Sequence, residues 1–134
     1  MATRTITLTG RPPVTIAEAK WPTIASASDK EFDNQYESQA NEISKWGVFV
    51  RQHDDGRALV YATYSYSSNW RGARCYSAKD GVLLSADSST DDIVKAIYAV
   101  CSDIASRECY GDDAKRWDTL AAECIADMPA EELS

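Results

Sequence analysis

The sequence predicts a single α+β domain, in which an antiparallel sheet of four to five strands carries two C-terminal helices packed on one face. Three observations favour this class. Residues 1–88 hold short segments that alternate apolar and polar side chains, residues 45–66 read as a hairpin, and residues 89–128 carry two helical stripes. A length of 134 residues is typical of one domain with a substantial core, so we expect residues 1–134 to fold together, with a frayed tail at 129–134.

The N-terminal part predicts two short strands and a short helix. Residues 4–9, RTITLT, alternate as a half-buried strand does, and residues 10–13 interrupt them before a second strand at 14–16. A Trp-Pro step then favours a short helix near 22–28, because proline suits the first helical turn. Residues 29–43 are polar, and we expect an irregular segment that leads into a strand.

The hairpin at 45–66 is the clearest element. Asp54-Asp55-Gly56 predicts a three-residue loop with Gly56 in the left-handed conformation, and this loop pairs Val50 with Val60 and Trp46 with Tyr64. One face then carries Trp46, Val48, Val50, Val60, Ala62, Tyr64 and Tyr66, which we expect to form the wall of the core. The other face carries Phe49, Arg51, Leu59, Tyr61, Thr63 and Ser65.

Residues 73–76 and 81–84 predict further strand material, with Lys79-Asp80-Gly81 as a turn between them. The first helix begins at an N-cap, Ser89, and is stopped by Gly111. The second helix is capped by Asp112 and precedes Pro129. The apolar stripes of the helices pack on the hairpin, and we expect a core that includes Trp46, Val48, Val50, Val60, Tyr64, Ile97, Val100, Trp117 and Leu120.

The net charge of −7 is concentrated near the C-terminus. Residues 1–90 hold ten Lys/Arg and ten Asp/Glu, whereas residues 91–134 hold four and eleven. Such a surface repels nucleic-acid phosphates and attracts basic protein surfaces, although it can also serve only solubility. Asp91–Lys95 and Asp103–Arg107 have the spacing of helical ion pairs. The acids with fewer nearby bases lie on the second helix, and we predict a partner-binding surface at Asp112, Asp113, Asp118, Glu123 and Asp127.

No catalytic signature is present, so we expect a non-enzymatic protein without a cofactor or a metal. The only histidine, His53, sits at the mouth of the hairpin loop, where packing or exposure is a better interpretation than catalysis. Cys75, Cys101, Cys109 and Cys124 include no CxxC pair and predict reduced thiols. No leader and no membrane-length apolar run are evident, which favours the cytoplasm and argues against a membrane partner.

Two further surfaces offer alternatives. Phe49, Leu59 and Tyr61, with Trp70 nearby, predict an exposed apolar patch on the open face of the sheet, which would drive homodimerisation. The other alternative is that the protein binds single-stranded nucleic acid weakly through Tyr61, Trp70, Arg71 and Arg74. The alternative for these arginines is that they only balance local acids, because the first 90 residues are neutral.

Several strings resemble small, poorly characterised proteins of Mu-like bacteriophages and prophages of proteobacteria. They are Ile6-Thr7-Leu8-Thr9, Arg11-Pro12-Pro13-Val14, Trp21-Pro22, Asp33-Asn34-Gln35-Tyr36-Glu37 and the run from Val50 to Arg57. The resemblance covers roughly residues 6–62 and brings no catalytic residues. It implies a phage accessory protein in the cytoplasm of a bacterial host, where such proteins often block a defence complex, as anti-CRISPR proteins do. We therefore expect an inhibitor whose acidic surface binds a basic bacterial protein or nucleoprotein complex, without direct contact to nucleic acid.

Overall fold

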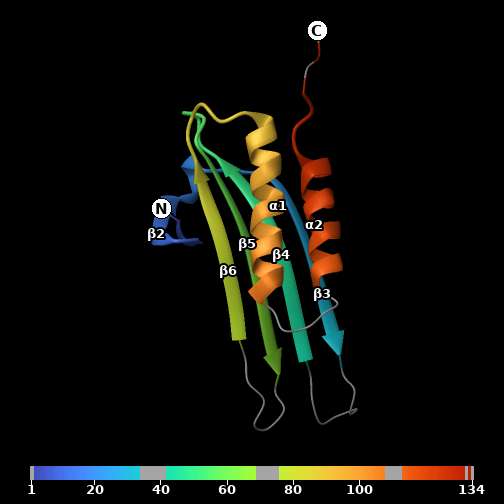
Figure 1. Cartoon of the computed structure of the whole chain (residues 1–134). Coiled ribbons are helices and arrows are strands. Elements are labelled where there is room, and N and C mark those ends of the chain that lie inside the picture. The colour runs from blue at the N-terminus through green and yellow to red at the C-terminus, as the bar shows by residue number, and fades with distance from the viewer. Residues whose placement is uncertain (1, 34–41, 69–75, 108–112, 132, 134) are drawn as a thin grey trace.

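The computed structural model describes residues 2–33, 42–68, 76–107, 113–131 and 133. The elements in chain order are β1 (Thr3–Leu8), β2 (Arg11–Ala17), a 3-10 helix η1 (Glu18–Lys20), β3 (Thr23–Asp33), β4 (Glu42–Gln52), β5 (Ala58–Ser68), β6 (Tyr76–Leu84), α1 (Thr90–Arg107) and α2 (Asp113–Asp127). Strands β3 to β6 form an antiparallel sheet in sequential order, and β1 and β2 form a separate two-stranded sheet. Both helices cover one face of the four-stranded sheet (Figure 1), which confirms the predicted α+β class.

The main core lies between the four-stranded sheet and the two helices. All nine residues that the sequence predicts for it are buried, and Val48, Val50, Val60, Ile97 and Trp117 are fully inaccessible. The apolar side chains of the two helices pack on alternate residues of β4 and β5, and together they form one apolar layer. None of the helices within the described ranges is long and apolar enough to cross a bilayer.

The hairpin of β4 and β5 has the predicted register. Val50 pairs with Val60, Trp46 pairs with Tyr64, and the His53 amide donates to the Arg57 carbonyl at 2.9 Å. Gly56 has a φ of 98°, a conformation that glycine adopts without a steric penalty. The three-residue loop therefore decides which side chains face the helices.

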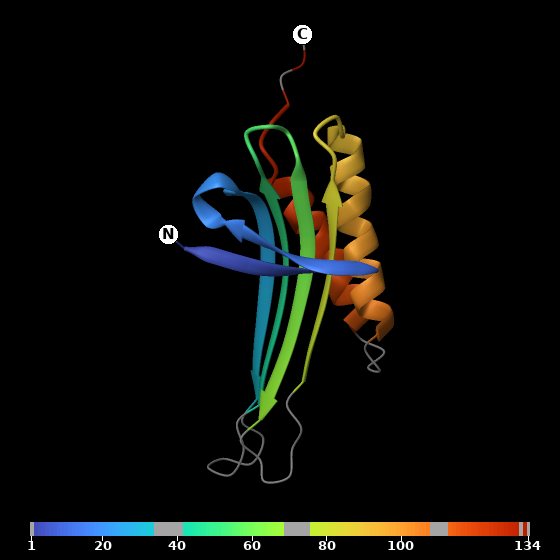
Figure 2. The same ribbon diagram turned by 90° about the vertical axis from the view of Figure 1, so that its left-hand side faces the viewer.

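The hairpin of β1 and β2 crosses the face of the sheet opposite to the helices (Figure 2). It closes a second apolar cluster, formed by Ile6, Leu8, Ile16, Trp21, Leu59 and Tyr61. Leu59 is 0% exposed and Tyr61 is 6% exposed, so the prediction that Phe49, Leu59 and Tyr61 form an exposed patch was wrong. The apolar character of this part of the face is explained by the N-terminal hairpin, which packs on it. The dimerisation hypothesis that depended on this patch loses its basis.

Two local predictions were also wrong. Residues 22–28 are not helical, because β3 begins at Thr23 and pairs along β4, and only the single turn η1 precedes it. Small residues such as Ala25 and Ala27 face the helices there, which leaves little apolar contrast in the sequence. Residues 29–33 continue this strand, and the rest of the segment expected to be irregular falls largely outside the described residues.

Lys79-Asp80-Gly81 is not a turn but lies within β6, where the N-terminal hairpin meets the sheet. The Thr9 hydroxyl donates to the Asp80 carboxylate at 2.9 Å, and Arg107 pairs with the same carboxylate oxygen at 2.8 Å. The charge of Asp80, which is 0% exposed, is thereby compensated inside the fold. Gly81 allows the Thr7 backbone to approach, since a Cβ at that position would lie 2.4 Å from the Thr7 carbonyl oxygen.

The start of α1 follows the prediction. The Asp92 amide donates to the Ser89 hydroxyl at 3.2 Å, and the Ser89 amide donates to the Asp92 carboxylate at 2.9 Å. These reciprocal bonds form a capping box, and the backbone hydrogen bond from Ser89 lowers the pKa of Asp92. The predicted stop at Gly111 and cap at Asp112 lie outside the described residues.

Candidate binding surfaces on the two faces of the sheet

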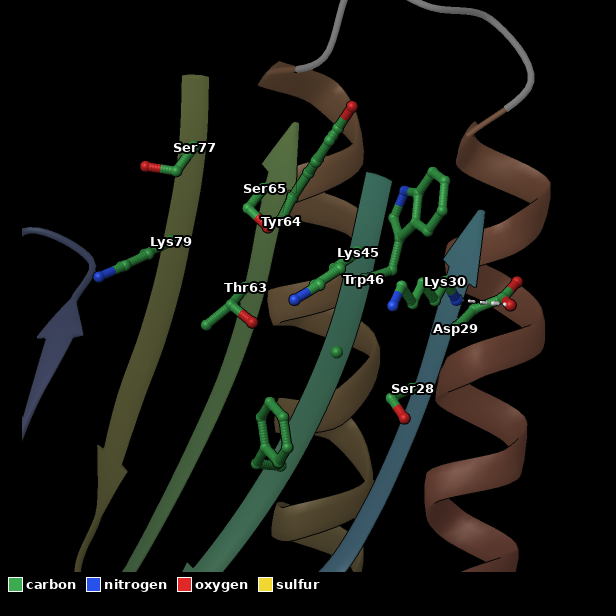
Figure 3. Close-up of a pocket in the computed structure, with 12 residues that line it drawn as sticks. Ser28, Asp29, Lys30, Lys45, Trp46, Thr63, Tyr64, Ser65, Ser77 and Lys79 are labelled. Carbon is green, nitrogen blue, oxygen red and sulfur yellow. Dashed lines mark hydrogen bonds between the residues drawn. The ribbon is translucent and has the colours of Figure 1, made fainter. Parts of the chain in front are cut away.

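The half of the open face that the N-terminal hairpin leaves uncovered forms a shallow groove of about 680 Å³, here called the open-face groove. Strand register arranges its side chains in two rows that run across the sheet. One row is Lys30, Lys45, Ser65 and Ser77, and the next is Ser28, Gly47, Thr63 and Lys79. Figure 3 looks onto this face, with the helices behind the sheet and the lysines on three different strands. The two rows thus present ammonium and hydroxyl groups, and Asp29, Trp46, Phe49 and Tyr64 complete the lining of the groove.

The separation of charges on β3 explains why the two rows of the groove are basic although Asp29 is among its lining residues. Successive residues of a strand point to opposite faces, so Lys30 lies on the open face while Asp29 and Glu31 lie on the helix side. Arg116 of α2 pairs with Glu31 at 3.0 Å and with Asp29 at 3.6 Å, and its guanidinium lies 3.8 Å from the centre of the Trp46 ring. Asp29 and Glu31 are therefore paired with the helix layer, and Arg116 compensates part of their charge.

The lysines of the groove repel one another. Lys30 lies directly opposite Lys45 on the neighbouring strand, an arrangement of like charges that destabilises a sheet. Lys79 stands on β6 across the groove, opposite Thr63. Within the described ranges, none of the ion pairs of the structure involves these three ammonium groups. The groove therefore carries three positive charges that the described side chains leave uncompensated.

An aromatic pair bounds the groove where the covered half begins. The ring of Phe49 stacks on Tyr61, with 5.1 Å between the ring centres and 25° between the planes. The Tyr61 hydroxyl in turn accepts a hydrogen bond from Nε of Arg51 at 2.9 Å. Gly47 leaves room for the Phe49 ring, because a Cβ there would lie 2.8 Å from it. Phe49 is therefore a partly buried ring at the edge of the lysine rows.

The acids predicted as the partner-binding surface do not gather in one patch. Asp118 and Glu123 are exposed, but positions five apart lie about 140° apart around a helix, so they occupy different flanks of α2. Asp118 lies nine positions before Asp127, which is about 180° away around the helix axis. Burial raises the pKa of the Cys101 thiol to about 12, and the charges of Cys124 and Asp118 add to the effect. Asp127 lies on the other flank, where its carboxylate accepts a hydrogen bond from the Ser26 amide of the edge strand β3 at 2.9 Å.

Most of the remaining residues that the sequence predicts for a binding surface lie outside the described residues. Asp112 lies outside the described residues, and Asp113 opens α2 with a side chain that is also outside them. Trp70, Arg71 and Arg74, which the nucleic-acid hypothesis needed, lie outside the described residues as well. Tyr61, its fourth member, is buried under the N-terminal hairpin, so it cannot serve as an exposed platform for a base.

The arginines of the helices pair with the sheet instead of with the helix acids. The predicted pairs Asp91–Lys95 and Asp103–Arg107 do not form, because Arg107 binds Asp80 at 2.8 Å and no contact within ion-pair distance joins the other two. Arg116 likewise binds the acids of β3. Exposed acids of the helices, such as Asp103, Asp118 and Glu123, are therefore not neutralised by these arginines. We call these three acids, together with the exposed Asp91 and Asp127, the acidic helix layer.

His53 has a structural environment. Its ring packs edge-on against Trp21 with 5.1 Å between the centres, and its Nδ1 accepts a hydrogen bond from the Asp55 amide at 3.0 Å. The backbone hydrogen bond from Arg57 lowers the pKa of Asp55, which belongs to the same turn. Across the described residues, no cluster of three or more His, Cys, Asp or Glu side chains could hold a metal ion.

Comparison with known proteins supplies no relative. No family model, no curated protein and no solved structure matches this chain. The resemblance to proteins of Mu-like phages therefore stays a prediction, and the surfaces of the molecule carry the functional argument.

Sequence reasoning missed the lysines of the groove. Lys45 has the same alternation as Phe49 and Thr63, so the predicted hairpin register alone could have placed it on the open face. Lys30 and Lys79 could not be placed, because the sequence predicts an irregular segment at 29–43 and a turn at Lys79-Asp80-Gly81. Their approach to Lys45 depends on pairing across four strands.

Proposed function

We propose that the protein is a non-enzymatic binding protein whose open-face groove holds an extended polyanion that carries phosphate groups. The observation that supports this most is the direct opposition of Lys30 and Lys45, with Lys79 across the groove. The one carboxylate among the described lining residues, Asp29, is paired with Arg116 of α2. Facing residues of neighbouring strands have Cβ atoms about 5 Å apart, and two unit charges at that separation repel by roughly 0.8 kcal/mol in water. A bound phosphate converts this repulsion into attraction, and the four hydroxyls of the rows can donate hydrogen bonds to its oxygens.

The overall charge of −7 does not oppose this proposal. The helices that carry the acidic helix layer stand on the other side of the sheet (Figure 2), and each helix is about 10 Å thick. The Debye length at physiological salt is about 8 Å, so the field of these acids is largely screened before it reaches the groove. The local charge of the groove then determines which ligands it attracts.

The test is a titration with inorganic polyphosphate at low salt. We expect binding that weakens by about tenfold when Lys45→Gln removes the central charge, and that falls steeply as salt is added, because released counterions drive such contacts. The matched controls are Lys95→Gln and Lys115→Gln, which remove equally exposed lysines from the helix side and should leave the affinity unchanged. Equal losses in all three variants, or no binding by the intact protein, would contradict the proposal.

The second candidate is the function expected from the sequence, an anti-CRISPR-like inhibitor that binds a basic surface of a bacterial defence complex. The inward pairing of Arg107 and Arg116 favours it, because Asp103, Asp118 and Glu123 then keep an unneutralised charge on the acidic helix layer. Asp127 is a poor choice for testing it, since its carboxylate also binds the Ser26 amide.

A pull-down from a bacterial lysate separates the two candidates. The variant Asp118→Lys/Glu123→Lys reverses two exposed charges, and Lys30→Gln/Lys45→Gln serves as the matched change on the opposite face. A stoichiometric protein that is lost only with the acidic variant supports the inhibitor. Retention of that protein by the acidic variant, or its loss with the lysine variant, argues against the acidic helix layer as the docking surface.

A further inference from the structure

We infer that the polyanion of the open-face groove is a single-stranded nucleic acid, whose phosphates meet the lysines while its bases stack on aromatic rings at both ends of the groove. This inference rests on the proposed function and adds the class of ligand. The observation behind it is the order of side chains along the open face. Phe49 lies at one end, the two lysine rows follow, and Phe32 lies beyond them in the row that pairs with Ile43.

Phe32 is an exposed ring beside the lysines. It is 56% exposed, although an apolar side chain of this size is normally buried, and strand alternation places it on the same face as Lys30 two residues earlier. Of the three large apolar side chains that are exposed among the described residues, it is the one on the open face of the sheet. Base stacking would give this ring the cover that the protein does not supply.

Phe49 is the second ring, and it is held in place. It stacks on Tyr61, which is buried and whose hydroxyl is bonded to Arg51, so one side of the ring is supported while its edge lines the groove. A ring fixed in this way loses little freedom when a base stacks on it. Phe32 and Phe49 are three rows apart, which corresponds to about 20 Å along the strands and leaves space for several nucleotides.

The alternation of aromatic rings and lysines favours a single strand over other polyanions. Bases are free to stack on protein rings only when they are not paired in a duplex, and every base offers a flat face of this kind. An inorganic polyphosphate or a purely acidic peptide would use the lysines but would leave Phe32 exposed. A nucleic acid with unpaired bases uses both features of this face.

The experiment compares four probes on the full chain by fluorescence anisotropy and competition. They are a labelled oligothymidylate of about eight nucleotides, an abasic strand with the same number of phosphates, inorganic polyphosphate and polyglutamate. Phe32→Ala is the main variant, because its ring is largely exposed and the fold should tolerate its loss. Phe49→Leu, which keeps apolar bulk over the covered cluster, is the second variant, and Lys95→Gln is the control on the helix side.

We expect the oligothymidylate to bind more tightly than the abasic strand, by about fivefold to 150-fold for each stacked base. Phe32→Ala should remove part of this margin and leave the affinity for polyphosphate unchanged. With three lysine contacts, the slope of log affinity against log salt should be about −2 for a single strand, and Lys45→Gln should reduce its size by about 0.7.

Two kinds of failure are distinguishable. Equal affinity for the oligothymidylate, the abasic strand and polyphosphate, with no effect of Phe32→Ala or Phe49→Leu, would overturn the inference and leave the polyanion groove intact. Polyglutamate that binds as tightly as the oligothymidylate would overturn it in favour of an acidic protein partner. Absence of binding to all four probes at low salt would overturn the proposed function as well.

Discussion

The two halves of the open face are made by the same strands, yet one half is covered and the other is bare. In the covered half, Leu59 and Tyr61 of β5 lie under the N-terminal hairpin and are almost inaccessible. In the bare half, Thr63 and Ser65 of the same strand continue the same face and line the open-face groove. The hairpin therefore covers the apolar half of the face, because burying that half is favourable, and leaves a half whose lysines and hydroxyls prefer water or a polar ligand.

The largest expected effect comes from removing the anchor of the covered half. Leu59→Ala deletes a side chain that is 0% exposed in the second cluster, and we expect a loss of about 2–5 kcal/mol in the free energy of unfolding. Denaturant titration measures this loss. Ser65→Ala, on the same strand and face but in the bare half, should change the stability by less than about 0.5 kcal/mol. Similar losses in the two variants would mean that the halves differ less than their burial indicates.

A matched pair of glycines gives an intermediate effect. In the covered half, a Cβ at Gly81 lies 2.4 Å from the Thr7 carbonyl oxygen, a backbone atom that can yield only if the hairpin shifts. We expect Gly81→Ala to destabilise the protein by about 1–3 kcal/mol in thermal denaturation. In the bare half, a Cβ at Gly47 meets the Phe49 ring at 2.8 Å, and this side chain can rotate. Gly47→Ala should therefore destabilise the protein less than Gly81→Ala does, but it should weaken binding in the open-face groove. A larger destabilisation by Gly47→Ala than by Gly81→Ala would contradict the comparison.

The smallest effect concerns the lysines of the bare half. Because Lys30 and Lys45 face each other across two strands, Lys45→Gln should leave the stability unchanged or raise it by about 0.2–1 kcal/mol at low salt. The gain should fade as salt screens the repulsion, which denaturant titrations at two ionic strengths can follow. A loss above about 1 kcal/mol would show that Lys45 has a structural role, and it would weaken the argument that its charge is kept for a ligand.

Local patterns were sufficient to predict several elements. The loop Asp54-Asp55-Gly56 fixes the hairpin register, because its length leaves one pairing that buries the valine stripe. The capping box at Ser89 and the apolar stripes of the helices likewise depend on residues that are close in sequence. Within the candidate site, the same register places Lys45 and Phe49 on the open face.

Other features depend on contacts between distant segments. Asp80-Gly81 has the composition of a turn, yet Thr9 and Arg107 compensate the carboxylate and the glycine accommodates the Thr7 backbone, so the chain stays extended. The segment that begins at Thr23 has weak apolar contrast and is a strand because β4 offers it an edge. The spacing Asp103–Arg107 favours a helical pair, but buried Asp80 binds the arginine more strongly than an exposed acid could.

The α+β class, the central hairpin, the face that packs on the helices and the concentration of acidic residues in the C-terminal third can all be read from the residues alone. These features follow from periodicity, turn chemistry and composition, which act over a few residues. The cover that the N-terminal hairpin places over Leu59 and Tyr61, and the meeting of Lys30, Lys45 and Lys79 on one open surface, become visible only in the assembled fold. The physical reason is that burial and charge proximity depend on which strands become neighbours, and four strands had to pair before either could be known.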